Sequence, residues 1–121
     1  MYLKEVVDLL DARVLTESSN PDLELNSAFS SDMLSHVLAY SNDKSILITA
    51  LYNPQVLRTA DLMGISCVIF IGRNEPDPAL IKLANSLGLT IIQSPYSMYV
   101  TCGLLFSHGL QGTFQDEQKG R

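Results

Sequence analysis

The chain has 121 residues and a formal net charge of −5. This length fits one domain, and the acidic balance argues against a nucleic-acid-binding protein, which needs clustered Lys and Arg. The amino terminus carries an acidic residue at position 5 and lacks a secretory-signal pattern, and no apolar run reaches the roughly 18 residues of a membrane span. We therefore expect a cytoplasmic protein that contacts neither nucleic acid nor membrane.

The first part of the chain is predicted to hold one helix and one short extended piece. Apolar residues recur at helical spacing over residues 2–10, with charged residues between them, which predicts an amphipathic helix. Residues 13–15 are expected to be extended. The polar stretch 16–22 contains Asn20-Pro21 and is predicted to be a loop.

From residue 25 onward, predicted strands and helices alternate. The strands are expected at 25–29, 45–50, 67–71 and 90–93, and the helices at 32–40, 54–63, 78–87 and 97–108. Strands alternating with helices of about ten residues indicate right-handed crossovers and parallel pairing. We predict an α/β fold over residues 1–110, a single layered domain with a mainly parallel sheet of four to five strands and helices packed on it. Residues 111–121 have few apolar side chains and are predicted to be a disordered tail.

Two helix starts and two helix ends have a clear local signature. Asn53-Pro54 and Asp77-Pro78 each place a capping residue before a proline at the first helical position. Gly64 and Gly88 stand where a helix is expected to end in a left-handed residue. These residues fix the predicted bounds of the helices over 54–63 and 78–87.

The carboxyl ends of parallel strands meet at one edge of a sheet, beside the amino termini of the following helices. Polar residues follow the predicted strands there, and free helix N–H groups favour a small anion. The candidate ligand-binding residues are Ser30, Ser31, Asp32, Asn53, Arg58 and Thr59. Two structural alternatives stay open. The short polar side chains are also standard helix caps, and Arg58 could instead pair with Asp61 at i,i+3.

Several residues with catalytic or ligand potential receive a structural interpretation. His36 and His108 are expected on the surface, and Cys67 and Cys102 are expected to be reduced thiols that form neither a disulfide nor a metal site. The apolar stripe of the last helix is expected to be core or a dimer face. Motifs for phosphate-binding loops, dinucleotides, nucleophilic serines and zinc proteases are absent from the sequence. We therefore expect no catalytic residue, no metal and no cofactor.

Three stretches together resemble a known family. They are LNSAFSSDMLSHVLAY (residues 25–40), SILITALYNPQVLRTADLMGISCVIFIG (45–72) and SPYSMYVTCGLLFSHGL (94–110). Their pattern resembles stand-alone DRTGG-domain proteins, across nearly all of residues 1–110. Arg58-Thr59 look like the Arg-Thr of the family name, whereas Leu57 replaces the aspartate and Ala60-Asp61 replace the two glycines.

The resemblance implies a fold and a role. DRTGG domains occur beside catalytic domains in some phosphate acetyltransferases and beside CBS pairs, and their fold is similar to the amino-terminal domain of HPr kinase/phosphorylase. A regulatory or ligand-sensing module is implied. We therefore expect a non-catalytic sensor, and a homodimer, that binds a small anionic ligand such as an adenine nucleotide at the loop edge of the sheet.

Two other functions remain alternatives. The first is a protein-interaction subunit without a ligand of its own, acting in trans on a redox or acetyl-phosphate enzyme through its last helix. The second, a small enzyme using Asp32 or His36 as acid or base, is disfavoured because nothing in the sequence places these groups beside a nucleophile.

Overall fold

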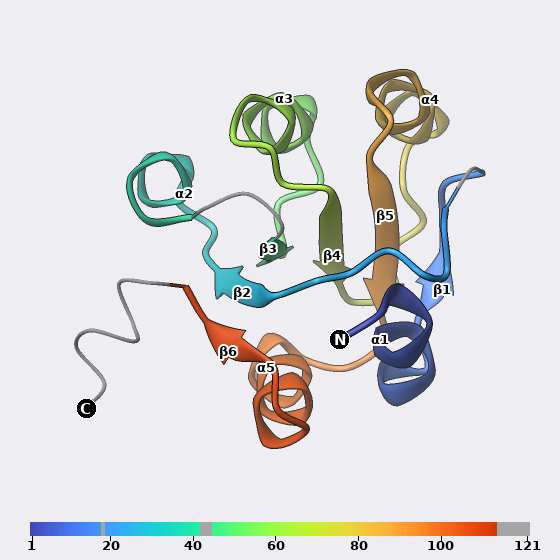
Figure 1. The fold of residues 1–121 in the computed structure, drawn as a ribbon. Coiled ribbons are helices and arrows are strands. Elements are labelled where there is room, and N and C mark those ends of the chain that lie inside the picture. The colour runs from blue at the N-terminus through green and yellow to red at the C-terminus, as the bar shows by residue number, and fades with distance from the viewer. Residues whose placement is uncertain (18, 42–44, 114–121) are drawn as a thin grey trace.

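A computed structural model describes residues 1–17, 19–41 and 45–113 (Figure 1). The helices are α1 (Leu3–Leu10), α2 (Leu34–Tyr40), α3 (Pro54–Leu62), α4 (Pro78–Leu87) and α5 (Met98–Ser107). The strands are β1 (Arg13–Val14), β2 (Ser27–Ser30), β3 (Ser45–Thr49), β4 (Cys67–Ile71), β5 (Thr90–Ser94) and β6 (Gln111–Gly112). Among the described residues, no helix has the length and apolar character needed to cross a membrane.

The described strands form one sheet in the order β1-β5-β4-β3-β2-β6. Every neighbouring pair is parallel except β1 with β5, which is antiparallel. The predicted α/β fold with a mainly parallel sheet is therefore confirmed. The sheet has six strands rather than four to five, because the two-residue strands β1 and β6 extend its two edges.

Helices cover both faces of the sheet. Figure 1 shows α2, α3 and α4 side by side on one face, and α1 and α5 on the other. Because side chains alternate along a strand, β3 sends Leu47 into the core beneath α2–α4, and Ile46 and Ile48 into the core beneath α1 and α5. Each face thus has its own buried apolar cluster.

The predicted helix caps are confirmed. The Asn53 side chain accepts a hydrogen bond from the Val56 N–H at 3.1 Å, and that of Asp77 accepts one from the Ala79 N–H at 2.9 Å. Gly88 ends α4 with φ of 72°, in the left-handed region that glycine adopts without strain. Local signals at these positions agree with the tertiary structure.

Two predicted segments differ from the structure. Helix α2 begins at Leu34 rather than at residue 32, because the Asp32 carboxylate bonds to the loop after β3 and leaves the helix uncapped.

The prediction of a disordered tail is wrong at its start. Gln111–Gly112 form β6 against β2, and Thr113 is buried. The rest of the predicted tail, residues 114–121, lies outside the described residues.

Candidate functional site

Strands β2 to β5 all end at the same edge of the sheet, where the following helices begin. The loop edge, as we call this region, comprises the loops at 31–33, 50–53, 72–77 and 95–97. All six candidate ligand-binding residues predicted from the sequence lie in these loops, at the end of β2 or on α3. Their individual environments differ.

Asp32 joins the loop after β2 to the end of β3. One of its carboxylate oxygens, Oδ1, accepts hydrogen bonds from the Thr49 hydroxyl and from the Ala50 N–H, both at 2.8 Å. The side chain of Asp32 is otherwise exposed. Asp32 therefore holds two loops together, and the exposed part of its carboxylate faces the edge where a ligand is expected.

Ser30 and Ser31 are neighbours in sequence but have different surroundings. The Ser31 hydroxyl accepts a hydrogen bond from the Met33 N–H at 3.0 Å, which forms a local turn before α2. Ser30 is the last residue of β2 and is exposed. Ser31 thus has a structural contact, whereas Ser30 faces a groove described below.

Asn53 lies at the amino terminus of α3, whereas Arg58 and Thr59 lie about one turn further along this helix. Asn53 caps this helix, as the structural alternative predicted. Arg58 is exposed, and neither of the two ion pairs among the described residues includes it, so the alternative Arg58–Asp61 pair is not formed in the described structure. Thr59 is half-buried. The Arg58 guanidinium is therefore left for solvent or an anion.

A hydrogen-bonded cluster at the loop edge was not predicted. The Tyr52 hydroxyl donates to the Ile71 carbonyl at 2.9 Å and accepts from Gln93 Nε2 at 2.9 Å, and the same nitrogen donates to the Asn74 carbonyl at 2.6 Å. The Tyr52 ring stacks on Phe70 at 4.5 Å. The cluster connects the loops after β3 and β4 to β5. In the sequence, the one feature that could have indicated this cluster was Gln93, a polar residue within the predicted strand 90–93.

The loop edge also contains a change in the direction of the connections. The connection after β4 leads to α4 on one face, whereas that after β5 leads to α5 on the other (Figure 1). Ligands of α/β proteins often bind where adjacent connections diverge in this way. Here Gly72, with φ of 104°, donates its N–H to the Ser94 carbonyl at 2.9 Å. Arg73 beside it is exposed.

The two cysteines lie in different environments on the same face of the sheet. Burial of Cys67 raises the pKa of its thiol from 9.0 to about 12, so this sulfur is a neutral thiol at physiological pH and a poor nucleophile. Cys102 on α5 is half-buried, and both cysteines are free. No group of three or more His, Cys, Asp or Glu that could hold a metal ion occurs within the described part of the chain.

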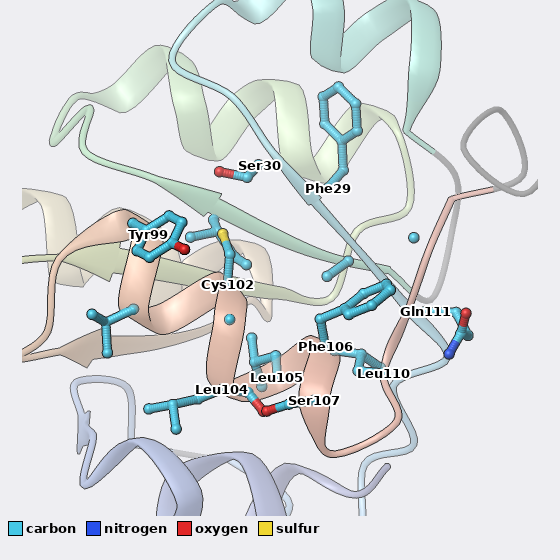
Figure 2. A pocket seen from close by; sticks show the side chains of 15 residues that line it. Phe29, Ser30, Tyr99, Cys102, Leu104, Leu105, Phe106, Ser107, Leu110 and Gln111 are labelled. Carbon is cyan, nitrogen blue, oxygen red and sulfur yellow. The ribbon is translucent and has the colours of Figure 1, made fainter. Parts of the chain in front are cut away.

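An apolar groove runs between α5 and the outer strands β2 and β6. Its volume is about 970 Å³. Figure 2 shows Tyr99 and Phe106 of α5 toward opposite ends of this groove, with Cys102 between them and Gln111 of β6 beside Phe106. Ser30 is the only one of the six predicted ligand-binding residues that lines it. The groove and α3 are on opposite faces of the sheet, so the candidate residues do not converge in this cavity.

Known proteins give a fold and a family for this chain. No curated protein matches it. A solved structure that resembles it contains the CBS and DRTGG domains of the regulatory region of Clostridium perfringens pyrophosphatase, complexed with the activator diadenosine tetraphosphate. The TM-score is 0.73 at 17% sequence identity, over 86% of this chain and 45% of that one. The likeness shows a shared fold, and this chain corresponds to less than half of the solved region.

The family assignment comes from the sequence. The family model described as the DRTGG domain matches residues 5–107. This match spans α1 to α5, which includes most of both faces of the sheet and the whole loop edge. It confirms the resemblance drawn from residues 25–40, 45–72 and 94–110. The chain therefore belongs to the DRTGG-domain family.

Proposed function

We propose that this chain is a non-catalytic regulatory module that binds a small anionic ligand at the loop edge, with an adenine nucleotide as the first candidate. Arg58 pairs with the anionic group, and the ligand is oriented by Ser31, Asp32, Asn53 and Thr59. Ser30 is left out of this site, because it lines the groove on the face of the sheet opposite α3. Because Asp32 carries a negative charge, it accepts hydrogen bonds from ligand hydroxyls, such as those of a ribose, and does not face the phosphates.

Membership of the DRTGG family and the resemblance to a regulatory region support this role. The activator in that region, diadenosine tetraphosphate, is an anionic adenine nucleotide. It is bound by a region that contains CBS as well as DRTGG domains, and the likeness covers 45% of that region. The location of a ligand on this chain therefore has to be argued from its own residues.

The observation that carries the proposal is the environment of Arg58. The chain has a net charge of −5, so an anion needs a local positive group. Arg58 is exposed on α3, outside both ion pairs among the described residues. A guanidinium can bind a phosphate or carboxylate through two parallel hydrogen bonds. The positive end of the α3 dipole lies one turn away.

The proposal is tested by thermal unfolding and calorimetric titration with ATP, diadenosine tetraphosphate and acetyl phosphate. A ligand that binds only the folded state raises the melting temperature in a saturable way. We expect Arg58→Ala to weaken the binding of the active compound at least tenfold, because a charge-assisted hydrogen bond is worth about 1.5–3 kcal/mol.

Arg73→Ala is the matched control, since Arg73 is also an exposed arginine at the loop edge. This variant is expected to bind with unchanged affinity. If Arg73→Ala abolished binding and Arg58→Ala did not, the ligand would lie between the ends of β4 and β5, and the role given to Arg58 would be wrong. Binding of none of the three compounds would contradict the proposed ligand class.

A further inference from the structure

We infer that the free edge of β1 is a docking site for an extended peptide that carries a basic side chain. The peptide pairs with the backbone of Val14, and its lysine or arginine lies in a small pocket between β1 and α1. This surface shares no residue with the ligand site proposed at the loop edge, so the two proposals can fail separately. Three features of the molecule support it: the open sheet edge, the lining of the pocket and the charges around the pocket.

Strand β1 lies at one end of the described sheet and has β5 as its neighbour there. The Leu15 N–H donates to the Ile91 carbonyl at 2.8 Å. Because backbone groups alternate in direction along a strand, the N–H and C=O of Val14 point away from β5. An edge strand with outward-facing backbone groups can pair with a further strand. Val14 is 42% exposed, so this edge is accessible to a peptide.

The side chain of Val14 indicates which face of the sheet the peptide meets. Val14 is in register with Ile92, which belongs to the core beneath α1 and α5. Residues directly opposite each other on paired strands point to the same face. The peptide residue opposite Val14 therefore sends its side chain to the side of the sheet where α1 lies next to β1 (Figure 1).

A pocket on that side lies between α1, β1 and the loop that follows β1. Its volume is about 280 Å³, which is just below the range of about 300–1,000 Å³ that is typical of small-molecule sites. Leu3, Val7 and Val14 form the apolar part of its lining. Asp8 and Glu17 also line it, and both are exposed. This lining fits a lysine or arginine, whose aliphatic stem packs on apolar surface while its charged end stays in water beside the carboxylates.

The charges around the pocket favour a cation. Residues 1–24 carry six acidic and two basic side chains, so four of the five net negative charges of the chain lie in this segment. The two basic residues, Lys4 and Arg13, each form an ion pair within the chain. Asp8 and Glu17 belong to neither of these pairs, which are the two that occur among the described residues. Their carboxylates are therefore left for solvent or for a cationic partner.

The probe is the blocked peptide acetyl-Thr-Val-Arg-Val-Thr-amide, titrated at low salt into the full chain labelled with nitrogen-15. We expect saturable shifts of the backbone amide signals of Val14 and Asp8, and no shift of the signals of α3. Two altered peptides are expected to bind at least tenfold more weakly. One has glutamate in place of the arginine, which brings a third carboxylate to the pocket. The other is N-methylated at the arginine, which removes the donor to the Val14 carbonyl.

A pair of protein variants separates the pocket from the general negative charge of this segment. Asp8→Asn is expected to weaken the peptide at least threefold, because it removes a carboxylate beside the basic side chain. Asp11→Asn is the matched control, since Asp11 is also exposed, follows α1 directly and does not line the pocket. This variant is expected to bind with unchanged affinity, and the amide spectrum of each variant verifies its fold.

Three results would overturn the inference. The first is the absence of a shift at Val14 with up to about 5 mM peptide, which is weaker than millimolar binding. The second is equal binding of the N-methylated peptide, because the backbone of Val14 would then play no part. The third is an equal loss of affinity in Asp8→Asn and Asp11→Asn, because the attraction would then be general and would not involve the pocket.

Discussion

The helices on the two faces of the sheet differ in how much of their apolar surface is buried. Beneath α2, α3 and α4, each helix presents an apolar stripe to the sheet; α3, for example, buries Val56, Leu57 and Ala60 and carries Arg58 and Asp61 on its outer side. On the other face, α5 buries only Thr101 and Leu105 and carries no charge at all. The α5 helix therefore leaves an apolar side and a groove exposed, whereas α3 turns charged residues outward. The comparison applies to these two helices: the outer side of α3 is charged, and that of α5 is not.

The largest effect is expected from truncating equivalent apolar side chains on the two faces. Leu57→Ala on α3 removes a fully buried side chain and should destabilise the fold by about 2–5 kcal/mol. Phe106→Ala on α5 should change the stability of the monomer by less than about 0.5 kcal/mol, because this ring is mostly exposed. Urea denaturation at a protein concentration below 1 µM, roughly, measures both. A large loss of monomer stability in Phe106→Ala would show that the α5 side is already packed.

A smaller effect is expected from the buried hydrogen bond that fastens α5 to β5. The hydroxyls of Ser94 and Thr101 are 2.7 Å apart, and both residues are fully buried. Thr101→Val should cost about 1–3 kcal/mol, since it removes the partner of a buried hydroxyl. The double variant Ser94→Ala, Thr101→Val should lose less than the sum of the two single changes, which a double-mutant cycle measures. Strict additivity would contradict the direct coupling of the two side chains.

The same substitution is expected to have opposite signs at two glycines. At Gly88 and at Gly103 an added Cβ meets no atom within 4 Å, so the backbone angle decides the outcome. Gly88→Ala should destabilise the fold by about 1 kcal/mol, because φ there is 72°. Gly103→Ala lies inside α5 without a positive φ and should stabilise the monomer by up to about 1 kcal/mol. Thermal unfolding of the two variants at low concentration measures both signs. An equal loss in both would mean that the two positions are equivalent.

The smallest effect concerns the reactivity of the two thiols. Cys102 lies beside the groove and should react with Ellman's reagent in the folded protein at pH 8, whereas Cys67 should react only during unfolding. Burial raises the pKa of the Cys67 thiol from 9.0 to about 12. The contribution of this neutral thiol to the free energy of unfolding is therefore complete below pH 9 and is lost as the pH rises toward 12. The absorbance change in native and denaturing buffer counts the two thiols separately. Rapid reaction of both in native buffer would contradict the burial of Cys67.

Much of the fold followed from local signals. The starts of α3 and α4 were predicted from Asn53-Pro54 and Asp77-Pro78, because a capping side chain and a proline act within a few residues of each other. The start of α2 was predicted less well. Asp32 reads as a helix cap in the sequence, but its carboxylate bonds across to Thr49 and Ala50. A contact with a neighbouring strand outweighed the local preference there.

The candidate site was predicted only in part. The loop edge follows from the alternation of strands and helices, and Arg58 was identified as a potential anion ligand. The sequence alone did not exclude an Arg58–Asp61 pair, which depends on side-chain orientation, and it gave no sign of the Tyr52–Gln93–Asn74 cluster, whose members come from three different loops or strands. Such clusters form only after the strands have paired.

The amino-acid sequence by itself determined the α/β class, the parallel alternation, the caps of two helices and the membership of the DRTGG family. These properties depend on residue patterns repeated at short range. The tertiary structure alone decided the pairing of Gln111–Gly112 with β2, the side of α5 that stays exposed, and the separation of Arg58 from the groove. The physical reason is the range of the interactions. Caps and periodicity act between neighbours in the chain, whereas strand order and helix coverage are set by contacts between segments that the sequence keeps far apart.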